Sequence, residues 1–204
     1  GKSTVAKLLA RLYDPTEGYV TYGEVDLRMA SLESLRQRVV VVPQEGFLFG
    51  GTIRDNIRVA RSTASDAEVT EALGSIGVLD HFEAFPDGLG TEVRERGSRL
   101  SAGERQLISL ARAALVDPAV LVLDEATSNL DPGTEAVVER ALERLMHGRT
   151  VIVVAHRLST VRRADRIAVI DHARLVELGT HDELVALGGR YAALSDAWIK
   201  SQPH

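Results

Sequence analysis

The chain has no cysteine among its 204 residues, which excludes disulfide frameworks and thiolate metal sites. Long hydrophobic runs are missing too, because runs such as 39–42 and 119–123 fall far below the roughly 20 residues that a membrane-spanning helix needs. No secretory signal peptide is visible. Positive charge is in the minority, since the chain has 24 basic and 29 acidic residues and therefore a net charge of −5. We therefore expect no nucleic-acid partner bound through a basic surface.

The remaining composition, 45% hydrophobic and 26% charged residues, is that of a globular protein with ample core material. Short β-branched runs alternate with longer helical patterns, which predicts an α/β fold with a parallel sheet. Continuous apolar runs predict strands that are buried on both faces, and therefore helices on both faces of the sheet. These runs are 39–42, 120–123 and 151–154.

Helical spacing covers residues 4–12, and between Pro43 and Pro118 it covers 67–76 and 102–116. We predict an α/β core built from 1–43 and 118–204, with a helical subdomain inserted over 44–117. Toward the carboxyl terminus, the pattern predicts a short helix, a hairpin and two closing helices. The corresponding ranges are 159–163, then 166–171 with 174–177, then 182–187 and 191–199.

The first four residues, Gly1-Lys2-Ser3-Thr4, head a predicted helix and match the end of the P-loop pattern G-x-x-x-x-G-K-[ST]. In such a loop the helix amino terminus cradles phosphates, the lysine reaches the β and γ phosphates, and the hydroxyl group ligates Mg²⁺. The alternative for this tetrapeptide is an ordinary polar helix start.

Asp124 and Glu125 directly follow a predicted buried strand. In open α/β sheets, ligands bind at the carboxyl ends of the strands, so Asp124 is placed to hold hydrated Mg²⁺. Glu125 is placed to orient or deprotonate an attacking water. The alternative is an acidic pair that caps the strand and the following turn.

The segment Leu-Ser-Ala-Gly-Glu-Arg-Gln over 100–106 resembles the signature of the ATP-binding cassette (ABC) ATPases, LSGGQ followed by RQ. Pro43-Gln44 resembles the Q-loop of that family, the segment 125–131 its D-loop and the segment 153–159 its switch-histidine loop. The D-loop continues the Asp124-Glu125 motif, so with the P-loop end the chain shows five motifs in the order and spacing of the family. The resemblance implies a P-loop NTPase core, ATP and Mg²⁺ as ligands, and ATP hydrolysis.

The resemblance also implies a role for each matching residue. Nucleotide would contact Gly1, Lys2, Ser3 and Thr4. The metal ion would be held by Ser3, Gln44 and Asp124. The catalytic residues would be three. Glu125 would act as the base, His156 would hydrogen-bond the γ-phosphate, and Gln44 would contact the attacking water.

The signature would act on the ATP of a second ABC ATPase domain, identical or different, in a head-to-tail pair. Ser101, Ala102 and Gly103 would face that γ-phosphate, and Asp131 would cross between the domains. Two residues depart from the signature: Ala102 replaces its first glycine and Glu104 replaces its glutamine. We expect Glu104, one turn into a helix, to face solvent.

The segments 44–49, 52–57 and 91–97 resemble those of ABC exporters. Because aromatic residues make up only 4% of the chain, Phe47 and Phe49 together predict a docking surface; the alternative for 47–49 is ordinary core. A transmembrane domain would then be fused upstream or lie on a partner chain, at the cytoplasmic face of a membrane, such as a bacterial plasma membrane. The start at Gly1 implies an ABC ATPase domain over 1–204 that lacks its amino-terminal strands and is truncated inside the P-loop. The alternatives are a soluble ABC ATPase without transport function and an inactive truncated cassette.

Overall fold

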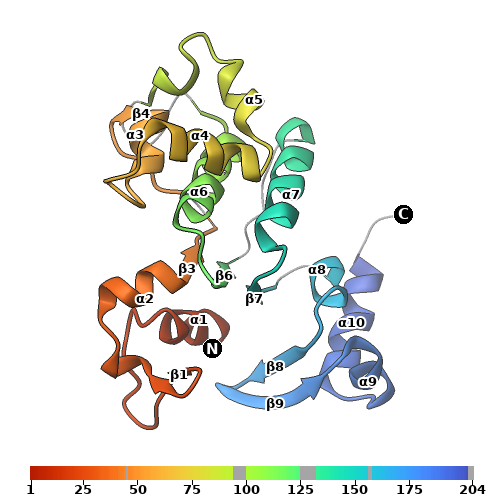
Figure 1. Ribbon diagram of the computed structural model, residues 1–204. Helices are drawn as coiled ribbons and strands as arrows, with labels where there is room; N and C mark the ends of the chain where they lie inside the picture. Colours follow the sequence, from red (N-terminus) through yellow and green to blue (C-terminus); the bar gives the residue numbers. More distant parts are fainter. Residues whose placement is uncertain (45, 94–99, 125–131, 156–157, 202–204) are drawn as a thin grey trace.

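The computed structural model describes residues 1–44, 46–93, 100–124, 132–155 and 158–201 (Figure 1). Its centre is a parallel sheet in which β6 lies between β3 and β7. Val120 pairs with Val39 on one side and with Thr150 on the other, so the three strands begin level with one another. The strands are β3 (Val39–Val42), β6 (Val120–Asp124) and β7 (Thr150–Val154). All three strands predicted from continuous apolar runs are confirmed, and so is the α/β class.

Helices cover both faces of this sheet, as predicted. Alternate residues of a strand point to opposite faces, and in β6 they enter two different hydrophobic clusters. Leu121 and Leu123 pack with α6 and α7, whereas Val122 packs with Ala6 of α1 and Leu35 of α2. The helices are α1 (Lys2–Leu9), α2 (Leu32–Arg38), α6 (Ala102–Val116) and α7 (Pro132–Met146).

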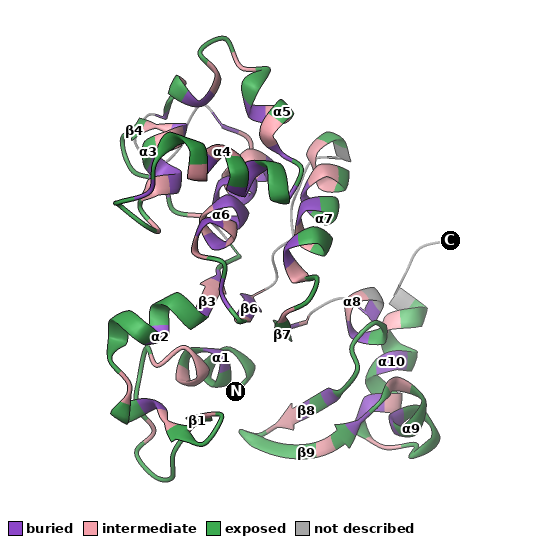
Figure 2. Cartoon of the chain, in the orientation of Figure 1, coloured by how far each residue is buried: buried purple, intermediate pink, exposed green. Residues whose placement is uncertain are grey.

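The segment between β3 and β6 is mostly helical, and α6 is its buried centre (Figure 2). The helix predicted over 67–76 is found shifted by one residue, and the helix predicted over 102–116 has the predicted bounds. The domain boundaries at 44 and 117 stay a prediction, because the core of this segment is continuous with Val42 and Leu121 of the sheet. Besides α6, the segment holds β4 (Gly51–Thr52), α3 (Ile53–Arg58), α4 (Asp66–Ser75), α5 (Leu79–Glu83), η2 (Gly88–Gly90) and β5 (Glu92–Val93).

The carboxyl-terminal elements form a third cluster, in which Tyr191 is buried against Ile167 and Leu184. The predicted helix, hairpin and two closing helices are all found there, within one or two residues of their predicted bounds. They are α8 (Leu158–Arg162), β8 (Ile167–Asp171), β9 (Arg174–Gly179), α9 (His181–Ala186) and α10 (Arg190–Ser201). A hairpin near the amino terminus was not predicted; it comprises β1 (Thr21–Tyr22) and β2 (Val25–Asp26), followed by η1 (Leu27–Met29).

Capping boxes fix where four helices begin. The hydroxyl groups of Thr52, Ser65, Ser101 and Thr180 each accept a hydrogen bond from the backbone three residues on, and the acidic side chain there reaches back to the cap. Within the part of the chain that the structure describes, none of the helices is long and apolar enough to cross a membrane.

Candidate functional site

The amino terminus of α1 lies at the carboxyl edge of the parallel sheet. Gly1 is the N-cap of α1, and no side chain caps the helix there. The first N–H groups of a helix have no acceptor within it, so this end can bind an anion. Lys2 donates from Nζ to the carbonyl oxygen of Ala155, 3.4 Å away, directly after β7 ends. The predicted phosphate-binding residues 1–4 are all exposed at this place.

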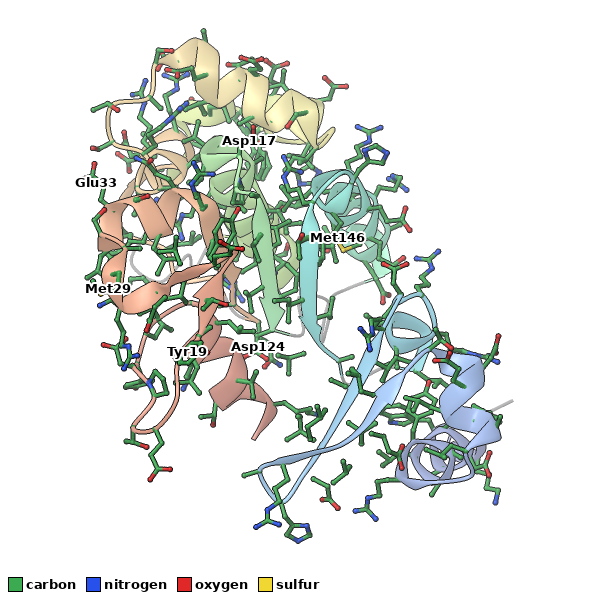
Figure 3. The ribbon with its side chains drawn as sticks, turned by 60° about the horizontal axis from the view of Figure 1, so that its bottom comes forward. Tyr19, Met29, Glu33, Asp117, Asp124 and Met146 are labelled. Atoms are coloured by element: carbon green, nitrogen blue, oxygen red, sulfur yellow. The ribbon has the colours of Figure 1, made fainter. Side chains whose placement is uncertain are left out.

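Asp124, the last residue of β6, lies at the same edge (Figure 3). It pairs in register with Val154, and its side chain is half-exposed. Gln44 follows the end of β3 by two residues and is also exposed. Because parallel strands end at one edge of a sheet, the fold gathers Gln44, Asp124 and the start of α1 on that edge. Three other predicted site residues, Glu125, Asp131 and His156, lie outside the described residues.

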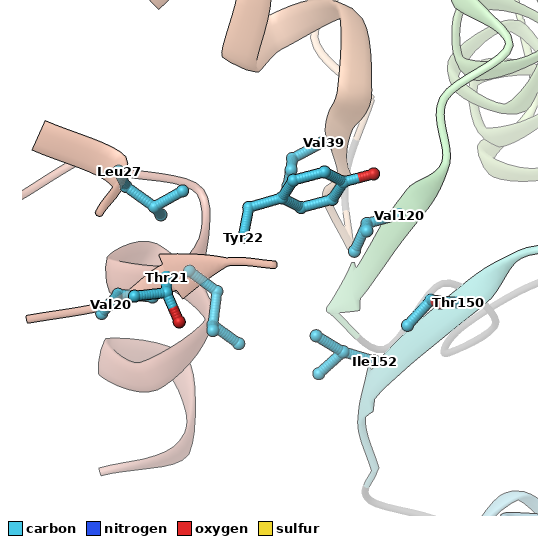
Figure 4. A pocket seen from close by; sticks show the side chains of 9 residues that line it. Val20, Thr21, Tyr22, Leu27, Val39, Val120, Thr150 and Ile152 are labelled. Atoms are coloured by element: carbon cyan, nitrogen blue, oxygen red, sulfur yellow. The ribbon is translucent and has the colours of Figure 1, made fainter. Parts of the chain in front are cut away.

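A pocket of about 130 Å³ lies at the opposite edge of the sheet (Figure 4). The first residues of the three strands, Val39, Val120 and Thr150, line it together with Leu9 at the end of α1. Thus α1 runs antiparallel to the strands, with Lys2 at their carboxyl ends and Leu9 at their amino ends. All the lining residues are uncharged, so this pocket is not where phosphates would bind.

Ser101 is the N-cap of α6, the helix that carries the predicted signature. Its Oγ accepts a hydrogen bond from the Glu104 backbone N–H at 3.1 Å, and its own backbone N–H donates to Glu104 Oε2 at 2.7 Å. The other carboxylate oxygen of Glu104 lies 3.9 Å from His81 Nε2. The expectation that Glu104 faces solvent is therefore wrong: its side chain is 19% exposed and folds back onto the cap. The signature pattern alone could not show this capping role of Glu104, because glutamine usually occupies that position of the signature.

Gly103 has a packing role that sequence reasoning missed. It is buried, and a Cβ atom added to it would lie 2.5 Å from Thr134 Cβ in the first turn of α7. Real Cβ atoms essentially never come that close, so only glycine permits the observed approach of α6 to α7. Ala102, which replaces the first glycine of the signature, is half-buried and helical. The methyl group of Ala102 is therefore tolerated, whereas one at Gly103 would not be.

Arg112 and Asn56 are further residues that the sequence analysis did not single out. Arg112 lies in the mostly apolar α6, and its guanidinium donates hydrogen bonds to the segment between β3 and α3 and to Asn56. Burial lowers the pKa of Arg112, although an arginine stays charged in proteins. The signal that could have pointed to Arg112 in the sequence is a charged residue within an otherwise mostly apolar helical pattern.

Comparisons with known proteins show which family the chain resembles in sequence and fold. A family model described as "ABC transporter" matches residues 1–128. The chain is 49% identical to the uncharacterized ABC transporter ATP-binding protein YknV of Bacillus subtilis (strain 168), over 97% of this chain and 33% of that protein. It is 45% identical to the beta-(1-->2)glucan export ATP-binding/permease protein NdvA of Agrobacterium vitis, over 95% of this chain and 33% of that protein.

The fold is similar to the structure of a bacterial Atm1-family ABC exporter with ATP bound. The TM-score is 0.87 at 40% sequence identity, covering 100% of this chain and 35% of that one. The chain thus spans about a third of the length of the curated relatives named above. With the family model, the related sequences and the fold in agreement, the chain belongs to the ABC transporter family, as an ATPase domain of the exporter type.

Proposed function

We propose that this domain binds ATP with its phosphates at the amino terminus of α1 and hydrolyses it to power export across a membrane. The observation that carries the proposal is the uncapped start of α1 beside the carboxyl ends of β6 and β7. Backbone N–H groups and the positive end of the helix dipole favour negative charge there. Lys2, Ser3 and Thr4 add a cation and two hydroxyl groups to the same place.

A Mg²⁺ ion fits the side chains gathered at this edge. The hydroxyl of Ser3, the amide oxygen of Gln44 and the carboxylate of Asp124 are the hard oxygen donors that Mg²⁺ prefers. Among the described residues there is no cluster of three or more histidine, cysteine or acidic side chains that could hold a metal by itself. Phosphate oxygens of ATP and water would therefore supply the other ligands, and the bound ion would offset the phosphate charge.

The proposed chemistry also uses residues outside the described part. Glu125 would take the proton of the attacking water, and His156 would donate to the γ-phosphate. Each directly follows a described residue at the sheet edge, Asp124 and Ala155 respectively. Gln44 would orient the water from the end of β3.

We further propose that α6 acts on ATP bound to a second ABC ATPase domain, identical or different. The Ser101 hydroxyl oxygen accepts the cap hydrogen bond, so its proton can be donated to a phosphate oxygen. The backbone N–H groups of Ala102 and Gly103 belong to the first turn of a long helix, where an anion is favoured. Asp131 would reach across between the domains.

The membrane partner would dock on Phe47 and Phe49, in the segment between β3 and β4. Their side chains are 60% and 49% exposed and form an edge-to-face pair with ring centroids 5.0 Å apart. Aromatic residues make up only 4% of the chain, so two exposed ones together favour an interface. The proposed occupant is a cytoplasmic segment of a transmembrane domain, fused or on a partner chain, at a bacterial plasma membrane. The ATP-binding/permease name of the relative NdvA supports this occupant.

The test is to measure ATP affinity in the purified natural gene product with Lys2→Ala, using Lys7→Ala as the matched control. Both lysines are exposed on α1, but Lys7 lies in its last turn, away from the phosphates. We expect Lys2→Ala to weaken ATP binding and Lys7→Ala to leave it unchanged. Equal affinities in both variants would refute the site. Fractionation of the natural product away from membranes would instead support a soluble ABC ATPase.

A further inference from the structure

The segment that carries Phe47 and Phe49 is fastened along one side of α6. Gln106 Nε2 donates to the Pro43 carbonyl oxygen at 3.4 Å, and both the Gln106 and Leu48 side chains are buried. Gly46 lies so close to α6 that an added Cβ would come within 2.8 Å of the Arg105 carbonyl oxygen. The backbone at Gly46 therefore packs closely on the helix, against the Ser109 hydroxyl group and the Arg105 carbonyl oxygen.

Arg112 ties the same segment to α6 with one direct hydrogen bond, and it makes two more to Asn56 of α3. Its Nη1 donates to the Phe47 carbonyl oxygen at 2.7 Å, its Nε donates to the Asn56 carbonyl oxygen at 2.8 Å, and its Nη2 donates to Asn56 Oδ1 at 3.0 Å. A guanidinium has a planar fork of donors that can satisfy several acceptors at once, which a lysine ammonium cannot reproduce.

Asn56 extends this connection to Phe49. The Asn56 side chain is 1% exposed; it accepts from the Phe49 backbone N–H at 2.9 Å and donates to the Phe49 carbonyl oxygen at 2.9 Å. It also donates to the Thr52 carbonyl oxygen at 3.0 Å. The backbones of both phenylalanines are thus fixed to α6, while their rings remain exposed.

We infer that Arg112 is a positioning residue that makes the Phe47–Phe49 segment and α6 move as one body. Ser101 lies eleven residues earlier in the same helix, a distance of about 16 Å along its axis. Movement of the segment by a docked partner would therefore displace the signature end of α6, and ATP at that end would displace the segment. The inference rests on the proposed function, in which ATP contacts Ser101 of a neighbouring domain.

The experiment uses the reciprocity of such coupling, because a ligand at one end must affect the other by the same free energy. A spin label at Gly50→Cys reports on the segment, since a Cβ at Gly50 has no neighbour within 4 Å and the 204 residues contain no cysteine. The label is placed in the natural gene product, with cysteines elsewhere replaced by serine. Its mobility is recorded with and without Mg²⁺ and the non-hydrolysable analogue AMP-PNP, whose affinity is measured in parallel.

We expect AMP-PNP to change the mobility of the label in the parent protein, and Arg112→Gln and Arg112→Lys to lose that change while still binding AMP-PNP. A purely structural arginine would lower the melting temperature without removing the response. The lysine variant keeps the charge and most of the volume, and thermal melts establish that each variant folds. The control is Arg163→Gln, whose side chain is 78% exposed and pairs with Glu143, and which should respond as the parent does.

An AMP-PNP response that persists in both Arg112 variants would overturn the inference. So would a parent protein that binds AMP-PNP but shows no response at the label. A parent protein that binds no AMP-PNP would instead refute the proposed function, and the inference would fail with it.

Discussion

Gly103 and Thr134 are in direct contact where the first turns of α6 and α7 meet, and the contact leaves no room for a side chain on Gly103. The glycine of the signature therefore serves the packing of two helices, whatever it does toward a nucleotide. Both helices contribute to the main hydrophobic cluster, so their separation is set partly at this point.

Replacing Gly103 with alanine should destabilise the protein by about 1–3 kcal/mol, the usual cost of overpacking a core. The matched control is Gly74→Ala in α4, where an added Cβ has nothing within 4 Å. That change should instead stabilise by about 0.5–1 kcal/mol, because alanine is the better helix former. Thermal or denaturant unfolding measures the change in stability of each variant. Equal changes for Gly103→Ala and Gly74→Ala would show that α6 and α7 can separate at no cost.

Glu104→Gln should leave both stability and ATPase activity close to those of the parent protein. The carboxylate is engaged with the Ser101 backbone N–H, and a glutamine amide oxygen can accept the same hydrogen bond. Glu104→Ala removes that acceptor and should cost about 1 kcal/mol. Steady-state phosphate release and unfolding are the measurements. A clear rise in ATPase activity for Glu104→Gln would mean that the carboxylate opposes the nucleotide despite its place in the cap.

The sheet and α6 could be predicted because their signals are local. Continuous apolar runs determine β3, β6 and β7, and the periodic apolar residues that end at Val116 determine α6. The rule that ligands gather at the carboxyl ends of parallel strands then placed Asp124 beside the start of α1.

What could not be predicted depends on contacts between distant parts of the chain. Thr134 is 31 residues beyond Gly103, and Asn56 is 56 residues before Arg112, so neither contact follows from local pattern. The two-residue strands β1 and β2 are too short to show any periodicity. The helix α7 was not predicted either, although its apolar residues at 138, 141 and 145 have helical spacing.

Glu125→Gln should retain ATP binding but lower turnover by at least about a hundredfold, the scale expected when a general base is lost. Glutamine keeps the size of the side chain but cannot take a proton from water. The matched control is Glu33→Gln in the first turn of α2, an exposed acid labelled in Figure 3, which should keep full activity. Nucleotide binding and phosphate release are measured on both variants. Turnover at the parent rate in Glu125→Gln would remove this residue from the catalytic role.

Acid should weaken the helix caps, and the direction follows from their carboxylates. The Thr180 backbone N–H donates to Glu183 at 2.8 Å, and this hydrogen bond, with that of the Thr180 hydroxyl group, lowers the pKa of Glu183. Hydrogen bonds from Ser65 likewise lower the pKa of Glu68. A carboxyl group with a lowered folded-state pKa stabilises the fold above its unfolded pKa, about 4.3 for glutamate, and loses that contribution as pH falls through the folded value.

Glu183→Gln isolates this effect, because glutamine can still accept the cap hydrogen bond but does not titrate. The parent protein should melt at a higher temperature than Glu183→Gln at pH 7, and the difference should disappear as pH falls below about 4. Thermal melts of both proteins across that range provide the measurement, with Asp196→Asn on α10 as the matched control for removal of one acidic charge. A difference that is the same at pH 7 and at pH 3 would show that the charge on Glu183 does not stabilise α9.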